Sequence, residues 1–144
     1  MNWIGHAQET LERDGYRLSV PRSAVVETLA DLGCSVTAKE IAARLREQGA
    51  DIGVASIYRT LELLDKLRLA RRVDAGEGVA RYEPIDPSGE HHHHMVCGRC
   101  GEVRAFEDSE LERAIERLST RVDYVVDTHD VTLRGECLAC RADS

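Results

Sequence analysis

The chain of 144 residues is 42% hydrophobic but only 4% aromatic, so aliphatic side chains must supply most of any core. This length permits one domain or two small ones. No run of about 18 apolar residues is present, which excludes a membrane-spanning helix, and the first residues lack the basic and apolar regions of a signal peptide. We therefore expect a cytoplasmic protein whose thiols stay reduced.

The net charge of −7 is unusual for a protein that binds nucleic acid, but the acidic residues are concentrated in the second half of the chain. Residues 1–84 hold 12 Lys/Arg and 13 Asp/Glu, whereas residues 85–144 hold 7 and 13. A nearly neutral first half can still present a local basic face, which is all that phosphate binding requires. The charge argues against tight non-specific DNA binding and leaves a DNA-binding first half possible.

The first 84 residues are predicted to form a helical domain that ends in a β-hairpin. Helices are expected over residues 2–15, from Pro21 to just before Gly33, from the capping-box pattern at residues 37–40 to Gly49, and from Val54 to Leu67. Residues 70–74 and 79–83 have the pattern of two strands around a Gly-rich turn.

This order of elements is typical of a winged helix-turn-helix domain, in which the last helix enters the major groove of DNA. On that interpretation Ser56, Tyr58 and Arg59 face the DNA. The arginines available to phosphate would be Arg71, Arg72 and Arg81. The alternative is a small helical domain whose last helix only packs and whose charges lie on a solvated face.

Two Cys-x-x-Cys pairs follow a linker that we place at residues 85–89. The pairs are Cys97 with Cys100 and Cys137 with Cys140. Four thiolates make a closed tetrahedral zinc shell with no open position, so a zinc ion held by them would be structural. The alternative of two redox dithiols is less favoured, because a thioredoxin-type motif is a single pair that precedes a helix.

Four consecutive histidines, residues 91–94, precede the first cysteine pair. If they lie in a strand, His92 and His94 point to one face and His91 and His93 to the other, so the run can serve two metal sites. The alternatives are a solvated polar run or an engineered tag, although tags stand at chain termini. His129 is a separate candidate ligand.

The rest of the second half is expected to contain strands over residues 102–106 and 122–134, which bring the two cysteine pairs together. Between them, Ser109-Glu110-Leu111-Glu112 has the pattern of a capping box at the start of an amphipathic helix. Glu112 would then have a structural role before any role in metal binding.

The chain resembles the ferric uptake regulator family over nearly its whole length. The residues that carry the resemblance are Gly53 to Leu61, Ala80 to Glu83, His91 to Gly101, and His129 eight residues before Cys137. The resemblance implies an α+β protein, with a winged-helix DNA-binding domain at residues 1–84, a hinge at 85–89, and a small α/β dimerisation domain with a four-cysteine zinc site at 90–144. It also implies a homodimer that binds A·T-rich inverted repeats when loaded with metal.

The resemblance assigns roles to individual residues. The ligands of the structural zinc would be Cys97, Cys100, Cys137 and Cys140. The ligands of the sensing site would be Glu83, His92 and His94, and those of an additional metal site would be His91, His93, Glu112 and His129. Tyr58 and Arg59 would face the DNA bases, with Ser56 beside them.

One departure from the family pattern concerns the sensing site. Many relatives carry a histidine ligand just before the capping box of residues 37–40, where this chain has Ser35, and a serine hydroxyl is a poor ligand for borderline divalent metals. Cys34, Asp108 or water could complete the shell. No cysteine follows the hairpin, unlike in zinc-sensing relatives, so iron or manganese is favoured over zinc.

We therefore expect a metal-dependent transcriptional regulator, a repressor of metal-uptake or stress genes, and not an enzyme. A zinc hydrolase would need an open coordination position and a motif such as His-Glu-x-x-His, which the sequence lacks. A peroxide-sensing or zinc-sensing member of the same family is an alternative. A cytosolic metal-buffering protein explains the histidines and cysteines but not the winged-helix pattern.

Overall fold

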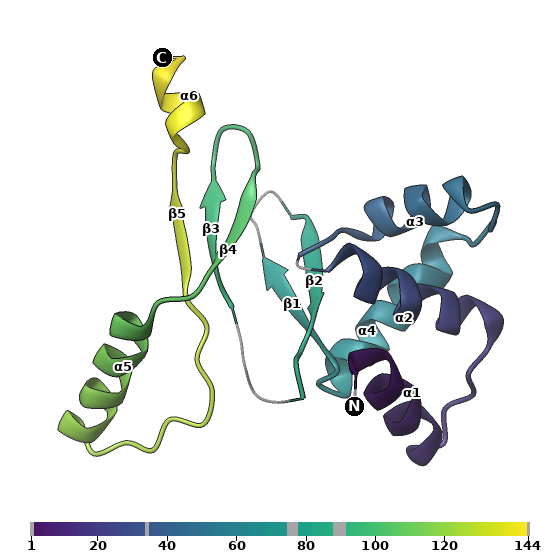
Figure 1. The fold of residues 1–144 in the computed structure, drawn as a ribbon, viewed down its shortest axis with the longest axis horizontal. Helices are drawn as coiled ribbons and strands as arrows, with labels where there is room; N and C mark the ends of the chain where they lie inside the picture. The colour runs from purple at the N-terminus through teal and green to yellow at the C-terminus, as the bar shows by residue number, and fades with distance from the viewer. Residues whose placement is uncertain (1, 34, 75–77, 88–91, 144) are drawn as a thin grey trace. The chain divides into compact units, whose positions relative to one another are not determined.

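The fold is described for residues 2–33, 35–74, 78–87 and 92–143 of a computed structural model (Figure 1). The chain divides into two compact units, residues 1–90 and residues 91–144, and each is described by itself. Among the described residues, no helix is both long enough and apolar enough to cross a membrane.

The first unit begins with four helices whose limits follow from their caps. They are α1 (Trp3–Arg13), α2 (Val20–Leu32), α3 (Ala38–Glu47) and α4 (Val54–Lys66). Side chains of Asn2, Ser19 and Thr37 accept hydrogen bonds from backbone N–H groups in the first turns of α1, α2 and α3. The capping box predicted at residues 37–40 is confirmed, since Thr37 and Glu40 each bind the other's backbone N–H.

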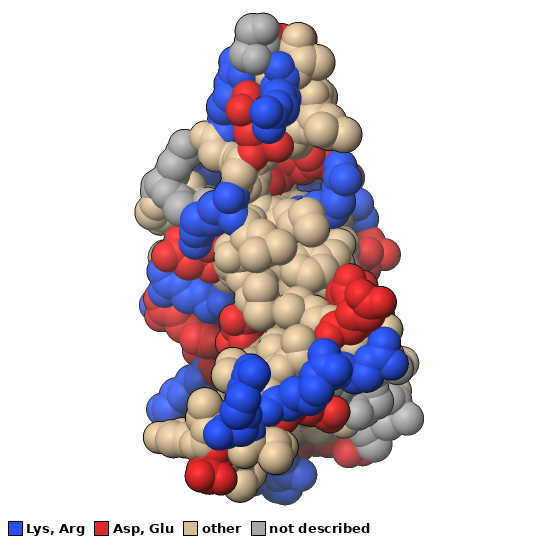
Figure 2. Space-filling model, turned by 90° about the vertical axis from the view of Figure 1, so that its left-hand side faces the viewer, with Lys and Arg blue, Asp and Glu red and all other residues tan. Residues whose placement is uncertain are grey.

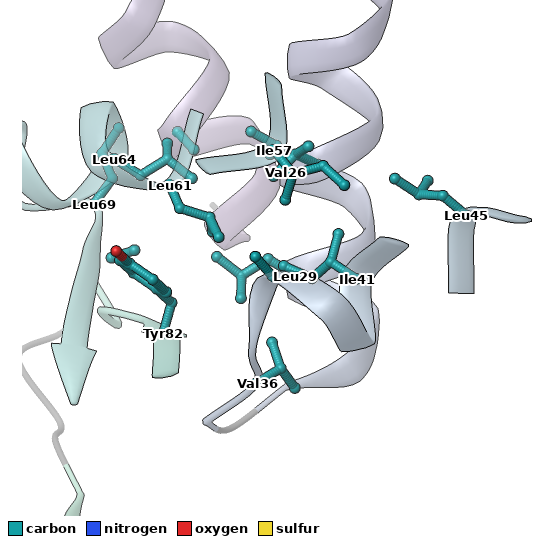
Figure 3. Close-up of a cluster of buried hydrophobic side chains, with 14 of the residues drawn as sticks. Val26, Leu29, Val36, Ile41, Leu45, Ile57, Leu61, Leu64, Leu69 and Tyr82 are labelled. Carbon is teal, nitrogen blue, oxygen red and sulfur yellow. The ribbon is translucent and has the colours of Figure 1, made fainter. Parts of the chain in front are cut away.

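A single core lies between these helices, as the labelled side chains of Figure 3 show. Ile57, Leu61 and Leu64 form the buried stripe of α4, and all three are fully buried. Their spacing of three and four residues places them on one side of the helix. The opposite side of α4 is therefore left to polar residues and Tyr58.

A hairpin joins this core through its second strand. β1 (Ala70–Asp74) and β2 (Ala80–Pro84) pair antiparallel, with Arg71 opposite Glu83. Tyr82 of β2 also exchanges two backbone hydrogen bonds with Val36, of 2.8 and 2.9 Å, and its side chain is 2% exposed. The hairpin is thus attached to the segment before α3, which holds the wing against the helices.

The second unit is a three-stranded sheet with two helices. β3 (His93–Cys97) lies in the centre, antiparallel to β4 (Val103–Phe106) and parallel to β5 (Thr132–Gly135). The chain between β4 and β5 contains α5 (Ser109–Arg121), and α6 (Leu138–Ala142) follows β5. A parallel pair requires such a long connection, because the chain must return to the same end of the sheet.

Two expectations for this unit were wrong. Ser109 does not cap α5: the N-cap is Asp108, whose carboxylate accepts hydrogen bonds from the N–H groups of Glu110 and Leu111 at 2.8 and 3.1 Å. A charged acceptor at a helix N-terminus is stabilised by the helix dipole as well as by the hydrogen bonds. Glu112 consequently has no capping role.

The strand predicted over residues 122–134 is only Thr132–Gly135. Val122 is the C-cap of α5, and Asp123 has a φ of 57°, which reverses the chain. The backbone N–H of Tyr124 then bonds to the carbonyl of Ser119 at 2.9 Å. The β-forming side chains after the helix were misleading, because helix termination decides the backbone path there.

Replacing Thr37 by Ala removes one half of the capping box and should lower the stability of the first unit by about 0.5–2 kcal/mol. Urea unfolding followed by the fluorescence of Trp3, the only tryptophan, would measure this, because Trp3 lies in this unit and donates a hydrogen bond to the Leu69 carbonyl. Thr120→Ala, at an exposed position of α5 in the other unit, is the control and should leave the Trp3 transition unchanged.

Candidate metal centres and nucleic-acid interface

The four predicted cysteine ligands come together at one end of the sheet. Cys97 ends β3, Cys137 is the N-cap of α6, and the parallel register pairs Cys97 with Gly135. All four sulfur atoms lie within 4.8 Å of one another, and those of Cys100 and Cys137 are 3.9 Å apart. Four sulfurs at the usual zinc–sulfur distance would be about 3.8 Å apart, so this set fits a tetrahedral zinc ion.

The thiols of this cluster differ in acidity. Backbone N–H groups of Cys100, Cys137 and Arg99 lower the pKa of Cys97 to about 6, and the N–H of Cys137 lies 3.4 Å from the Cys97 sulfur. By contrast, the hydrogen bond with the Cys137 thiol raises the pKa of Cys140 to about 12. Without metal, Cys97 therefore carries the first negative charge, and a zinc ion would displace the remaining protons.

Arg99 links the two cysteine pairs, a role that sequence reasoning did not assign to it. Its Nη1 donates to Glu136 Oε1 and to the carbonyl oxygen of Cys140, both at 2.7 Å. Arg99 lies between Cys97 and Cys100 in the sequence. Of its two partners, Glu136 directly precedes Cys137, and Cys140 belongs to the second cysteine pair. This bridge holds the two pairs together in addition to any metal.

A second cluster lies elsewhere in the same unit. His93 is 1% exposed, and its Nε2 lies 2.5 Å from Glu112 Oε1. Nε2 of His129 lies 2.6 Å from the other oxygen, Glu112 Oε2. Two imidazoles that share one carboxylate can be held by protons or by a divalent cation, and one oxygen and two nitrogens suit such a cation. His91, the remaining predicted ligand, lies outside the described residues.

The predicted sensing-site residues are distributed between the two units. Glu83 lies in β2, is 3% exposed, and has Arg71 Nη1 4.0 Å from its Oε1. His94 lies in β3 and is 3% exposed, whereas His92 stands just before that strand, with its Nδ1 3.2 Å from Glu107 Oε1. His92 and His94 thus belong to the same unit, and Glu83 belongs to the other.

The three candidates for a further sensing-site ligand have different positions. Ser35 is buried, and its Oγ has no hydrogen-bond partner among the described residues. Asp108 is engaged as the cap of α5. Cys34 lies outside the described residues.

The residues predicted to face DNA lie on the first two turns of α4, away from its buried stripe. Tyr58 is 40% exposed, and Arg59 is exposed and donates to the Ser56 hydroxyl at 3.3 Å. No acidic residue stands in the first turn of this helix. This end of α4 is therefore the part best suited to an anionic partner.

Two of the three arginines of the hairpin have partners within the first unit. Arg71 lies near Glu83, and Arg81 lies 3.5 Å from Glu40 and donates to the Ser35 carbonyl at 3.0 Å. Arg72 is exposed. Arg71 and Arg81 thus each have a carboxylate partner within the domain, and their availability to phosphate stays a prediction.

In zinc-free, reduced protein, one thiolate should titrate with a midpoint near pH 6, in contrast to the ordinary value of 9.0. Because the pKa is lowered, the thiolate is present above this midpoint and is lost as the pH falls through it. Ultraviolet thiolate absorbance would measure the step, which Cys97→Ser should remove and Cys100→Ser should retain. A step that survives Cys97→Ser would show that another thiol ionises first.

Comparison with known proteins identifies a family. The model of the ferric uptake regulator family matches residues 13–134. The ferric uptake regulation protein of Bacillus subtilis (strain 168) is 32% identical over 141 residues, which cover 96% of this chain and 95% of that protein.

Solved structures agree with this match. The Vibrio cholerae ferric uptake regulator is 28% identical, with a TM-score of 0.77 over 90% of this chain and 98% of that one. The ferric uptake regulator of Pseudomonas aeruginosa, solved with manganese, is 26% identical, with a TM-score of 0.78 over 91% of this chain and 97% of that one. The chain therefore belongs to the ferric uptake regulator family of metal-responsive transcription regulators and is not an enzyme.

Proposed function

We propose that this chain is a homodimeric, metal-dependent repressor of metal-uptake or stress genes, acting on DNA in the cytoplasm. The single observation that supports this most strongly is the combination, in one family member, of a winged helix with an open recognition face and two separate clusters of metal-ligating side chains. A metal-buffering protein would not require a winged helix with an exposed recognition face.

The proposed DNA interface is the start of α4. Ser56, Tyr58 and Arg59 would face base edges in the major groove of an A·T-rich inverted repeat. Tyr58 offers an apolar ring for thymine methyl groups, and Arg59 offers a guanidinium for a base or phosphate. Farther along the helix, Glu62 and Asp65 are exposed, so only its first turns suit the negatively charged groove.

The proposed dimer interface is the apolar face of the second unit. Figure 2 shows a broad area free of charged residues, with basic and acidic residues around it. The exposed large hydrophobic side chains of this unit are Met95, Leu118, Val122, Tyr124, Val125, Val126, Leu133 and Leu138. Exposed apolar surface of this kind is typical of an interaction site, and β5, at the edge of its sheet, offers backbone groups for pairing.

The proposed metal assignment separates a structural site from two others. Cys97, Cys100, Cys137 and Cys140 would hold Zn²⁺ permanently. Glu83, His92 and His94 would bind the sensed Fe²⁺ or Mn²⁺, and His93, Glu112 and His129, with His91, would form the additional site. A carboxylate and imidazoles without thiolate favour these harder metals over zinc in the sensing set.

The proposed mechanism is a shift of population. Metal bound by residues of both units would favour the arrangement in which two recognition helices match two half-sites. The coupling between metal and DNA would be about 1–3 kcal/mol, a typical allosteric value. If the metal is Fe²⁺, oxidation of a histidine ligand by peroxide would provide a second signal.

The double substitution of His92 and His94 by Ala should abolish metal-dependent DNA binding while leaving a folded, zinc-containing dimer. Fluorescence anisotropy on upstream DNA at one fixed salt concentration would measure this, with Fe²⁺ (anaerobic), Mn²⁺ and Zn²⁺ added separately. Arg59→Ala is the comparison and should weaken DNA binding without changing metal affinity. A double variant that still binds DNA only with metal would contradict the proposed sensing site.

Leu133→Arg should convert the dimer to a monomer, because it places a charge on β5, within the proposed apolar interface. Sedimentation equilibrium would measure the mass, and circular dichroism would verify folding. Val79→Arg is the matched control, since Val79 is 45% exposed and Leu133 is 48% exposed. A Leu133→Arg variant that remains a dimer would place the interface elsewhere.

A further inference from the structure

His92 and His94 supply two nitrogen ligands from the second unit. Ser35 offers only a hydroxyl, which is a poor ligand for such metals, and the Oδ1 atom of Asp108 already accepts both hydrogen bonds that cap α5. The residues that share a face of the sheet with the two histidines are a further source of ligands.

The register of β3 and β4 identifies such a residue. His93 pairs with Phe106 and His94 with Ala105, and the same register continued by one position places His92 opposite Glu107. Directly opposite residues of an antiparallel pair lie on the same face, and side chains two apart in a strand share a face. His92, His94 and Glu107 thus belong to one face, with Ala105 as their fourth neighbour.

One side-chain distance agrees with this assignment. Glu107 Oε1 lies 3.2 Å from His92 Nδ1. On the opposite face, His93 contacts the Phe106 ring, with centroids 5.6 Å apart, and meets Glu112. The two clusters are therefore separated by the sheet. Ala105, opposite His94, has no ligating atom.

The exposure of His92 and Glu107 indicates that their ion pair has a role other than stabilising the fold. The side chains of His92 and Glu107 are 47% and 63% exposed, and exposed ion pairs contribute only about 0–1 kcal/mol. An accessible carboxylate beside an accessible imidazole can instead release its partner and bind a metal at little cost to the fold.

We propose that Glu107 is a ligand of the sensed metal, together with His92 and His94. This inference rests on the proposed sensing site and adds a residue to it. Glu107 adds a carboxylate to the two imidazoles of the second unit, whereas Ser35 offers only a hydroxyl. An additional oxygen ligand favours Mn²⁺ and Fe²⁺ over Zn²⁺, so Glu107 also determines metal preference.

The test uses the full chain with its cysteine zinc in place, in a His129→Ala background that disables the additional site. Mn²⁺ affinity is measured by electron paramagnetic resonance, and the Co²⁺ absorption spectrum reports the number of ligands. Glu107→Gln should weaken Mn²⁺ binding about tenfold or more, because even partners that contact metal ligands only indirectly have effects of this size. Glu110→Gln removes the same charge three residues away and should leave both readouts unchanged.

Glu107→His provides a second variant, because it replaces the oxygen ligand by nitrogen. Co²⁺ and Zn²⁺ binding should be retained, while Mn²⁺ binding remains weak. Unchanged Mn²⁺ affinity and an unchanged Co²⁺ spectrum in Glu107→Gln would overturn the role of Glu107. If His92→Ala/His94→Ala then abolishes Mn²⁺ binding, only this inference has failed; if that variant also binds normally, the proposed sensing site has failed with it.

Discussion

The parallel pairing of β3 with β5 is the constraint on which the second unit depends. It brings Cys97 and Cys100 to Cys137 and Cys140, although Cys100 and Cys137 are 37 residues apart in the chain. Closing so long a loop costs conformational entropy, and the bridge from Arg99 to Glu136 and Cys140 offsets part of that cost. A zinc ion held by the four thiolates would stabilise the closed loop further.

The central position of β3 allows one short run of histidines to serve two purposes. His93 turns to one face of the sheet, where Glu112 and His129 meet it, and His92 lies beside Glu107 on the other. Neighbours in the sequence therefore belong to different clusters. If both proposed sites hold metal, the ion on one face of the sheet could be exchanged without disturbing the site on the other face, provided that β3 stays paired with β4 and β5.

In the first unit, a single helix contributes to the core and also carries the proposed recognition residues. α4 contributes a fully buried stripe to the core and presents Tyr58 and Arg59 on its other side. The hairpin is attached to the helices by the bridge between Tyr82 and Val36, and its arginines mostly neutralise local carboxylates. The proposed recognition surface is thus concentrated at the start of one helix, which agrees with a nearly neutral domain.

Local patterns in the sequence determined the helices of the first unit, the capping box at Thr37, the hairpin, the two cysteine pairs and the family. These features depend on caps, apolar spacing and motif residues that lie close together in the chain. Only the tertiary structure decided that Asp108 caps α5, that the strand after α5 begins at Thr132, and that Glu107 lies beside His92. Those outcomes depend on where α5 begins and ends and on strand register, and register relates residues whose separation in the sequence carries no periodic signal.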